Sequence, residues 1–190
     1  MARKYLAFLG TAKYTECVYH FRGQTIRTSF IQEALTSVLC RDWTAADEIL
    51  IFTTREAEQA NWTPHDGLQE RLTRLQLACQ HHAVEIPKGK IEDELWKIFT
   101  TIAEKLHDND EIIFDITYGF RSLPILALII INYVKFVKHC SLAGVYYGAF
   151  DEQREPRESR LTQPATPATT IPIFDLTPFV SVLDWTVGID

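Results

Sequence analysis

Apolar runs separated by polar turns recur along the chain, and most of them have the length of a β-strand. A run of about four to eight apolar residues between turn signals is typical of a strand buried on both faces of a sheet. The sequence predicts six strands, over residues 4–9, 48–54, 83–86, 111–116, 141–150 and 171–177. Two further runs, 15–20 and 24–30, flank Gly23 and predict a β-hairpin at a sheet edge.

Between these strands the apolar positions recur every three or four residues, which is the spacing of a helix that packs one face against a sheet. Helices are predicted over residues 30–40, 68–81, 91–106 and 123–137, with a short one starting at Pro178. Strands that alternate with helices pair in parallel through right-handed crossovers. We therefore expect an α/β fold, with a Rossmann-like, doubly wound, mostly parallel sheet and an inserted β-hairpin.

A turn rich in hydrogen-bonding residues joins the strand at 111–116 to the helix that begins near Pro124. Its residues are Asp115, Thr117, Tyr118, Gly119, Phe120, Arg121 and Ser122. In an open parallel sheet, ligands bind at the carboxyl ends of the strands, where free N–H groups at a helix N-terminus attract anions. The turn therefore predicts a phosphate or nucleotide site. It is equally compatible with residues that only cap the helix, beside a solvated Arg121.

A second loop of this kind follows the first predicted strand. It comprises Gly10, Thr11, Ala12, Lys13 and Tyr14. The loop matches neither the P-loop pattern GxxxxGK[ST] nor the dinucleotide fingerprint GxGxxG, so a standard nucleotide-cofactor enzyme is not expected. Thr53 and Thr54 end another strand at the same edge of the predicted sheet, which makes them further candidates for ligand contact.

Length and composition narrow the class of protein. At 190 residues and 46% hydrophobic, the chain is long enough for one domain with a sizeable core. The net charge of -6 argues against a broad DNA- or RNA-binding surface, which depends on many Lys and Arg residues, but it permits a small anionic ligand. The four cysteines are far apart and form no CxxC pair. Neither a zinc site nor a disulfide framework is predicted, and no metal or cofactor is expected.

The most apolar segment, 123–137, predicts a buried helix rather than a membrane span. Asn132 and Lys135 interrupt it, and it is shorter than the roughly 20 residues that a span requires. The N-terminus has no secretory signal pattern, because its first apolar run is a short strand that ends at Gly10. We expect a cytoplasmic protein with reduced cysteines and no membrane partner.

Two motifs together carry a resemblance to a known family. They are YLAFLGTAKYTEC at residues 5–17 and DITYGFRSLP at residues 115–124. The pair resembles the CRISPR-associated Rossmann fold (CARF) domains of type III CRISPR ancillary proteins. The most similar subgroup usually carries a C-terminal HEPN ribonuclease domain. The resemblance spans almost the whole chain, including the hairpin and the late stretch at 175–179.

The resemblance implies a homodimer whose two subunits form one symmetric pocket for a cyclic oligoadenylate, most often cyclic tetra-adenylate. By position, the two motifs contribute Gly10, Thr11, Ala12, Lys13, Thr117, Tyr118, Gly119, Arg121 and Ser122 to this pocket. Backbone N–H groups and hydroxyls would bind phosphates, Lys13 and Arg121 would supply positive charge, and a tyrosine ring would stack on adenine. Many relatives have histidine at the position of Tyr118, so any hydrogen-bonding or acid role of that histidine does not transfer to this chain.

The resemblance also implies an organisation and a set of functions. Residues 1–177 would form the ligand-binding domain, and residues 178–190 would begin a C-terminal helix or a linker to an effector domain absent from this chain. The leading hypothesis is a sensor that binds cyclic oligoadenylate and regulates that effector in antiviral defence. One alternative is a ring nuclease that cleaves the ligand without a metal, with Thr11, Lys13, Thr117, Tyr118 and Arg121 as candidate catalytic residues. A third hypothesis does not depend on the resemblance: the loops are only capped turns, and the chain is a Rossmann-like domain that binds other proteins.

Overall fold

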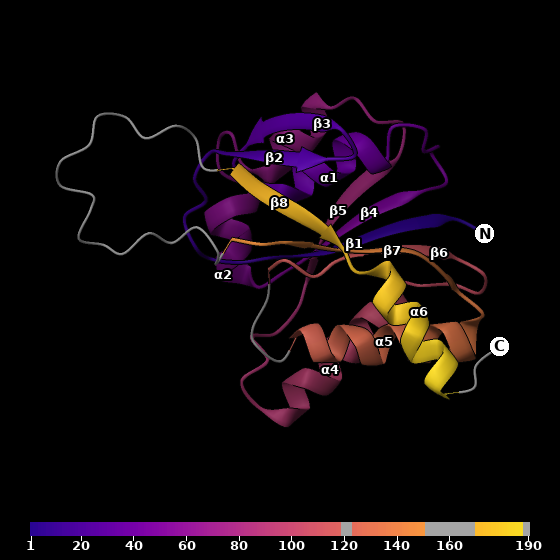
Figure 1. The fold of residues 1–190 in the computed structure, drawn as a ribbon. Helices are drawn as coiled ribbons and strands as arrows, with labels where there is room; N and C mark the ends of the chain where they lie inside the picture. The colour runs from indigo at the N-terminus through magenta and orange to yellow at the C-terminus, as the bar shows by residue number, and fades with distance from the viewer. Residues whose placement is uncertain (119–122, 151–169, 188–190) are drawn as a thin grey trace, which may run out of the picture.

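The structure is a computed structural model that describes residues 1–118, 123–150 and 170–187, without the side chains of residues 123 and 183–187. Within these residues, eight strands form one sheet with helices on both faces (Figure 1). The strand order across the sheet is β3-β2-β8-β7-β6-β1-β4-β5. The strands are β1 Arg3–Leu9, β2 Cys17–Phe21, β3 Gln24–Thr28, β4 Glu48–Thr53, β5 Gln80–Glu85, β6 Glu111–Asp115, β7 Ser141–Gly148 and β8 Thr170–Asp175.

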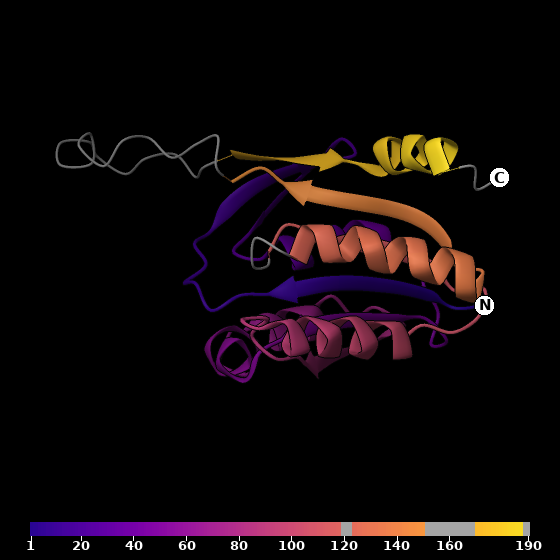
Figure 2. The ribbon, with the colours of Figure 1, turned by 90° about the horizontal axis from the view of Figure 1, so that it is seen from below.

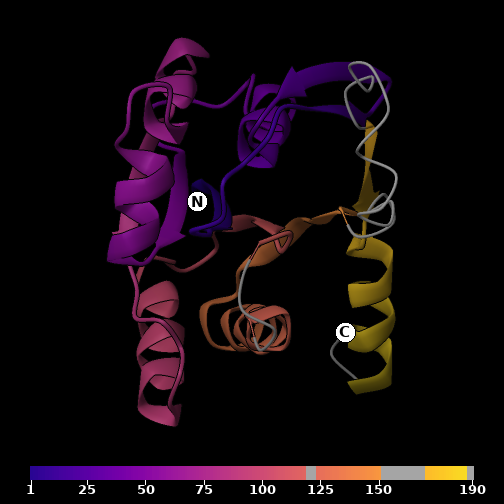
Figure 3. The same cartoon turned by 90° about the vertical axis from the view of Figure 1, so that its left-hand side faces the viewer.

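The helices divide between the two faces of the sheet. Their bounds are α1 Ile31–Leu39, α2 Arg55–Ala57, a π-helix η1 Glu58–Trp62, α3 Leu68–Arg74, α4 Glu92–Glu104, α5 Leu123–Lys138 and α6 Thr177–Val187. Helices α1 and α3 pack on one face, and α4 and α5 pack on the other. Figures 2 and 3 show α5 between α4 and α6 on this second face.

Successive side chains of β1 enter two different cores. Tyr5 and Ala7 pack with α1 and α3, whereas Leu6 and Phe8 pack with α4 and α5. Strands β4 and β6, which flank β1, alternate in the same way. A strand that is buried on both faces needs apolar residues at almost every position. This requirement explains the continuous apolar runs in the sequence.

The predicted α/β fold with a mostly parallel sheet and a β-hairpin is confirmed. Strand β1 pairs in parallel with β4 and β6, and parallel pairing continues to β5 on one side and to β7 on the other. The sheet is mixed, because β8 runs antiparallel to β7. The β2–β3 hairpin lies at the edge beyond β8, and its turn has positive φ at Arg22 and Gly23.

One predicted helix is wrong in part. The sequence predicts a helix over 68–81 and a strand only over 83–86, but α3 ends at Arg74 and β5 already begins at Gln80. The backbone turns away from the helix at Gln76, whose φ is 53°. Gln80 to His82 then pair with the amino half of β4. These polar residues are tolerated in a strand because β5 is an edge strand with partly exposed side chains.

Helix α5 is buried on one side only. Its 16 residues are strongly apolar, yet no helix in the described part of the chain is long and apolar enough to cross a membrane. Ile130, Ile131 and Val134 enter the core beneath the sheet. Ile129 and Phe136 instead lie 53% and 72% exposed. The helix therefore has an uncovered apolar face.

A partly buried ion pair fixes the start of β1. The Arg3 backbone N–H and side chain both donate hydrogen bonds to the Asp47 carboxylate, at 2.7 to 3.2 Å, and the Thr44 N–H donates a further one at 2.7 Å. Burial alone would raise the pKa of Asp47, but these hydrogen bonds from Arg3 and Thr44 lower it to about 2. The carboxylate ties the amino end of β1 to the segment that leads into β4.

We expect Asp47→Asn to lower the free energy of unfolding by about 1–2 kcal/mol at pH 7, because it removes this ion pair. The pKa of Asp47 is lower in the folded state than its usual value of 3.8. The stabilisation is therefore complete above the unfolded pKa and is lost as the pH falls toward 2. Urea unfolding at pH 7 and at pH 3 measures the free energy of unfolding of both proteins.

The control is Asp42→Asn, at an exposed carboxylate that also pairs with Arg3, and it should change stability little. A stability difference that does not shrink with falling pH contradicts the prediction.

Candidate functional site

Three neighbouring parallel strands end at the same edge of the sheet. They are β6, β1 and β4, which end at Asp115, Leu9 and Thr53. The loops that follow them therefore lie side by side at the carboxyl edge, which faces the viewer in Figure 3. This is where open α/β sheets bind ligands. The sequence predicted each of these loops as part of one site, and the described parts of all three meet here.

A hydrogen bond within the loop after β1 holds this loop in place, and its other residues are exposed. The hydroxyl of Tyr14 accepts a hydrogen bond from the Gly10 N–H at 2.9 Å. A Cβ added to Gly10 would lie 3.3 Å from the same hydroxyl, which is a tight contact. Thr11, Ala12 and Lys13 are exposed. The loop thus presents a hydroxyl, an ammonium group and backbone donors to solvent.

The tyrosine rings connect this loop to the loop after β6. The rings of Tyr14 and Tyr118 meet edge to face with their centroids 4.8 Å apart, and Tyr118 also packs on Phe150. Tyr14 continues the cluster to Phe30 at 5.0 Å. Burial raises the pKa of both tyrosines above its ordinary value, so both phenols stay neutral near pH 7. Their aromatic packing holds the two loops together.

Asp115 organises the start of the loop after β6. Its carboxylate is 1% exposed and accepts hydrogen bonds from the Tyr5 hydroxyl at 3.1 Å and from the Thr117 N–H at 2.9 Å. Burial raises the pKa of Asp115 to about 6, although hydrogen bonds from Thr117 and Tyr5 act in the opposite direction. Asp115 therefore holds the backbone of this loop in place from the core and does not face a ligand.

Thr117 has a structural partner. Its hydroxyl accepts a hydrogen bond from the Gly148 N–H at 2.9 Å, which ties the loop to the end of β7. Gly148 allows this approach, because an added Cβ would lie 2.3 Å from Ile31 Cδ1 and 3.3 Å from Thr117 Cγ2.

A cavity of about 280 Å³ lies where these loops meet. Six predicted site residues line it, namely Gly10, Thr11, Ala12, Tyr14, Thr54 and Tyr118. The remaining lining is apolar and comes from Phe8, Leu9, Phe52, Ala57 and Ile86. Polar groups at the loop and an apolar floor are typical of a site for an amphipathic ligand such as a nucleotide.

Other predicted site residues lie outside this cavity. Lys13 lines an adjacent cavity of about 200 Å³ with His65 and Arg71. Thr53 is fully buried and donates its hydroxyl hydrogen bond to the Thr54 carbonyl, and the Thr54 hydroxyl caps α2 by accepting from the Ala57 N–H. Gly119, Phe120, Arg121 and Ser122 lie outside the described residues, so their part in the site stays a prediction.

Asn61 is a residue of the site that the sequence did not reveal. Its side-chain amide donates to the Gly10 carbonyl at 2.7 Å and to the Ala12 carbonyl at 3.0 Å. It lies in η1, 49 to 51 residues away along the chain. An asparagine next to Trp62 inside a polar stretch matches no motif, so only the tertiary structure brings it to the loop.

Comparison with known proteins places the chain in a family. The family model described as the CARF domain of the CRISPR system endoribonuclease Csx1 matches residues 4–151. The CRISPR-associated protein MJ1674 of Methanocaldococcus jannaschii is 30% identical over 106 residues. The aligned region is 54% of this chain but only 15% of that protein, so the chain spans a small part of its relative. Because the family model covers most of the chain, including the loops at the carboxyl edge, the chain belongs to the family of Csx1 CARF domains.

Proposed function

We propose that this domain is a sensor that binds a cyclic oligoadenylate, specifically a ring of four adenylates, at the carboxyl edge of the sheet. The observation that carries the proposal is the cavity between the β1 and β6 loops. There, exposed donors at Thr11 and Ala12 face an apolar floor beside the Tyr118 ring. Phosphates suit the donors, and an adenine suits the ring and the floor. In a longer protein, ligand binding would regulate an effector domain, such as the HEPN ribonuclease that the resemblance implies.

The size of the cavity supports a site shared between two copies of the chain. At about 280 Å³ it lies at the lower bound of small-molecule sites, roughly 300–1,000 Å³. Such a volume accommodates one nucleotide rather than a ring of several. A symmetric ring would therefore lie across two copies of this edge, and a two-fold ligand fits an isologous dimer.

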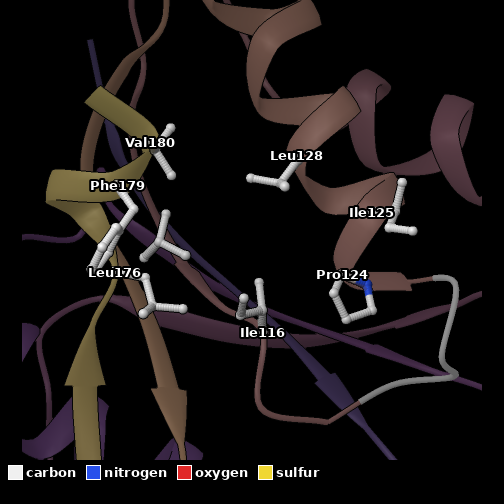
Figure 4. Close-up of a pocket in the computed structure, with 8 residues that line it drawn as sticks. Ile116, Pro124, Ile125, Leu128, Leu176, Phe179 and Val180 are labelled. Atoms are coloured by element: carbon white, nitrogen blue, oxygen red, sulfur yellow. The ribbon is translucent and has the colours of Figure 1, made fainter. Parts of the chain in front are cut away.

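The uncovered face of α5 supports a homodimer of this kind. Ile125, Ile129 and Phe136 of α5 are more than half exposed, and Phe179 of α6 is 71% exposed. Side chains from α5 and α6 point into a shared groove of about 270 Å³ (Figure 4). Exposed apolar side chains gathered on one helix, beside an apolar groove, are typical of an interaction site. Because α5 follows the β6 loop, a second copy on this face would bring the two candidate sites together.

The state of the tyrosines supports sensing over cleavage. A ring nuclease needs groups that move a proton or stabilise charge as the ribose 2′-hydroxyl attacks its phosphate. Burial raises the pKa of Tyr14 and of Tyr118, which disfavours a tyrosinate that could act as the base for the 2′-hydroxyl. Tyr14 also uses its hydroxyl oxygen to accept from Gly10. These two side chains are built to hold the loops in place.

We expect Lys13→Ala to weaken the binding of cyclic tetra-adenylate about tenfold, because one charge-assisted hydrogen bond to a phosphate contributes about 1.5 kcal/mol. Isothermal titration at two salt concentrations measures the loss of affinity and its electrostatic origin.

The control is Lys105→Ala, since it removes the same charge from an exposed position after α4, at the opposite edge of the sheet. No heat from the unaltered protein with any ring size would refute the proposed ligand. Unchanged affinity of Lys13→Ala would refute the part given to Lys13.

We expect the unaltered chain to be a dimer and Ile129→Glu to be a monomer, because a carboxylate at a buried apolar interface would lose its hydration. Light scattering coupled to size-exclusion chromatography measures both masses. Gln69→Glu adds the same charge at an exposed position on α3, across the sheet, and should remain a dimer. If Ile129→Glu has the mass of a dimer, the interface lies elsewhere.

We expect cyclic tetra-adenylate to remain intact during incubation with excess protein. The assay uses radiolabelled ligand and separates the ring from linear products that carry a 2′,3′-cyclic phosphate. Accumulation of such products, abolished by Lys13→Ala, would instead make the domain a ring nuclease.

A further inference from the structure

Asn61 makes two hydrogen bonds to one loop of the candidate site. Its Nδ2 donates to the carbonyl oxygens of Gly10 at 2.7 Å and Ala12 at 3.0 Å, and the residue is only 9% exposed. The amide NH₂ group has two N–H bonds, so one Asn61 side chain can satisfy both carbonyls at once. Both carbonyls therefore point toward η1.

These two bonds also set the direction of two backbone donors. A trans peptide unit is planar, and its N–H points opposite to its C=O. The peptide bonds of the described residues are trans. Asn61 holds the carbonyls of the Gly10–Thr11 and Ala12–Lys13 peptides. The N–H groups of Thr11 and Lys13 must therefore both point away from Asn61, on the opposite side of the loop.

Neither of these N–H groups has an acceptor among the described residues. The Gly10 N–H differs, because the Tyr14 hydroxyl accepts its hydrogen bond. Thr11 and Lys13 are exposed, so the two free donors face solvent, beside the Thr11 hydroxyl and the Lys13 ammonium group. Backbone N–H groups that point the same way, here two residues apart, can bind one anion together.

The position of Asn61 is itself fixed by the fold. Helix η1 follows β4 and α2, and the Glu58 N–H donates to the Thr54 carbonyl at 2.9 Å. The neighbouring Trp62 is buried in the core with α3. The wider turn of a π-helix is often found at functional sites. Here it brings two consecutive residues, Asn61 and Trp62, to buried positions.

We propose that Asn61 is a positioning residue that aligns the Thr11 and Lys13 N–H groups to bind one phosphate of the ligand. The inference rests on the proposed function for the identity of the ligand. It adds a residue outside both sequence motifs and gives the β1 loop a specific task. The Lys13 ammonium supplies charge, while Asn61 supplies the geometry of the backbone donors.

Asn61→Asp and Asn61→Ala test this role. The aspartate has the same shape but puts carboxylate oxygens against two carbonyls, and the alanine removes both hydrogen bonds. Each variant should bind cyclic tetra-adenylate at least about tenfold more weakly. Asp47→Asn is the control, because it lowers stability at the amino edge of the sheet and should retain affinity. If both Asn61 variants bind as tightly as the unaltered protein, the proposal is overturned.

Nuclear magnetic resonance of ¹⁵N-labelled protein gives the decisive readout, first on the unaltered protein and then on the Asn61 variants. Titration with cyclic tetra-adenylate should shift the Thr11 and Lys13 amide signals and leave the Gly10 amide, already bonded to Tyr14, much less affected. Both shifts should be lost in the Asn61 variants. A shift confined to Gly10, or shifts that persist without Asn61, would overturn the proposal even if a variant folded poorly.

A parallel titration with inorganic pyrophosphate separates this inference from the proposed ligand. Shifts at Thr11 and Lys13 that depend on Asn61 with pyrophosphate, but no response to cyclic tetra-adenylate, would uphold the role of Asn61 and refute the ligand. If neither anion shifts these amides in the unaltered protein, the loop is no anion site and the proposal fails.

Discussion

The burial of β1 on both of its faces, between β6 and β4, is the constraint on which the rest of the structure depends. Parallel pairing on both sides forces these three strands to end at the same edge, so the loops after Leu9, Thr53 and Asp115 become neighbours. Helices must then cover both faces, because each face carries large apolar side chains. The position of the candidate site is thus a consequence of how the core is packed, and the chemistry of the site depends on the short loops alone.

Those loops are held by groups that do not face a ligand. Asp115 is buried and accepts from Tyr5 and Thr117, and the hydroxyl of Thr117 in turn accepts from Gly148. Tyr14 accepts from Gly10 and packs on the Tyr118 ring. A loop that is fixed before binding loses less conformational entropy when a ligand arrives. Several residues that the sequence marks as candidates for ligand contact therefore act first on the loops themselves, which explains why hydroxyls and tyrosines are dense here.

Much of the fold could be predicted from the sequence, because burial on two faces leaves a clear apolar signal. The strands at 48–54 and 111–116 and the hairpin around Gly23 belong to this class. The edge strand β5 was predicted only in its second half, since its exposed face allows Gln80 and His82 and so gives no apolar run. The motifs located the loops of the site, but the hydrogen bonds of Asn61 depend on a contact across 49 to 51 residues. No local pattern encodes such a contact.

The same arrangement links the site to the uncovered helical face. Helix α5 follows the loop after β6, and its exposed side carries Ile125, Ile129 and Phe136. Ile116, two residues before Tyr118 in that loop, lines the groove between α5 and α6 (Figure 4). A shift of the loop upon binding would therefore act on the groove through Ile116 as well as on the start of α5. Under the proposed function, a pairing of these faces that brings the two loops together strengthens the binding of a ligand that spans both copies. By linkage, ligand binding stabilises the dimer by the same free energy by which dimerisation strengthens ligand binding.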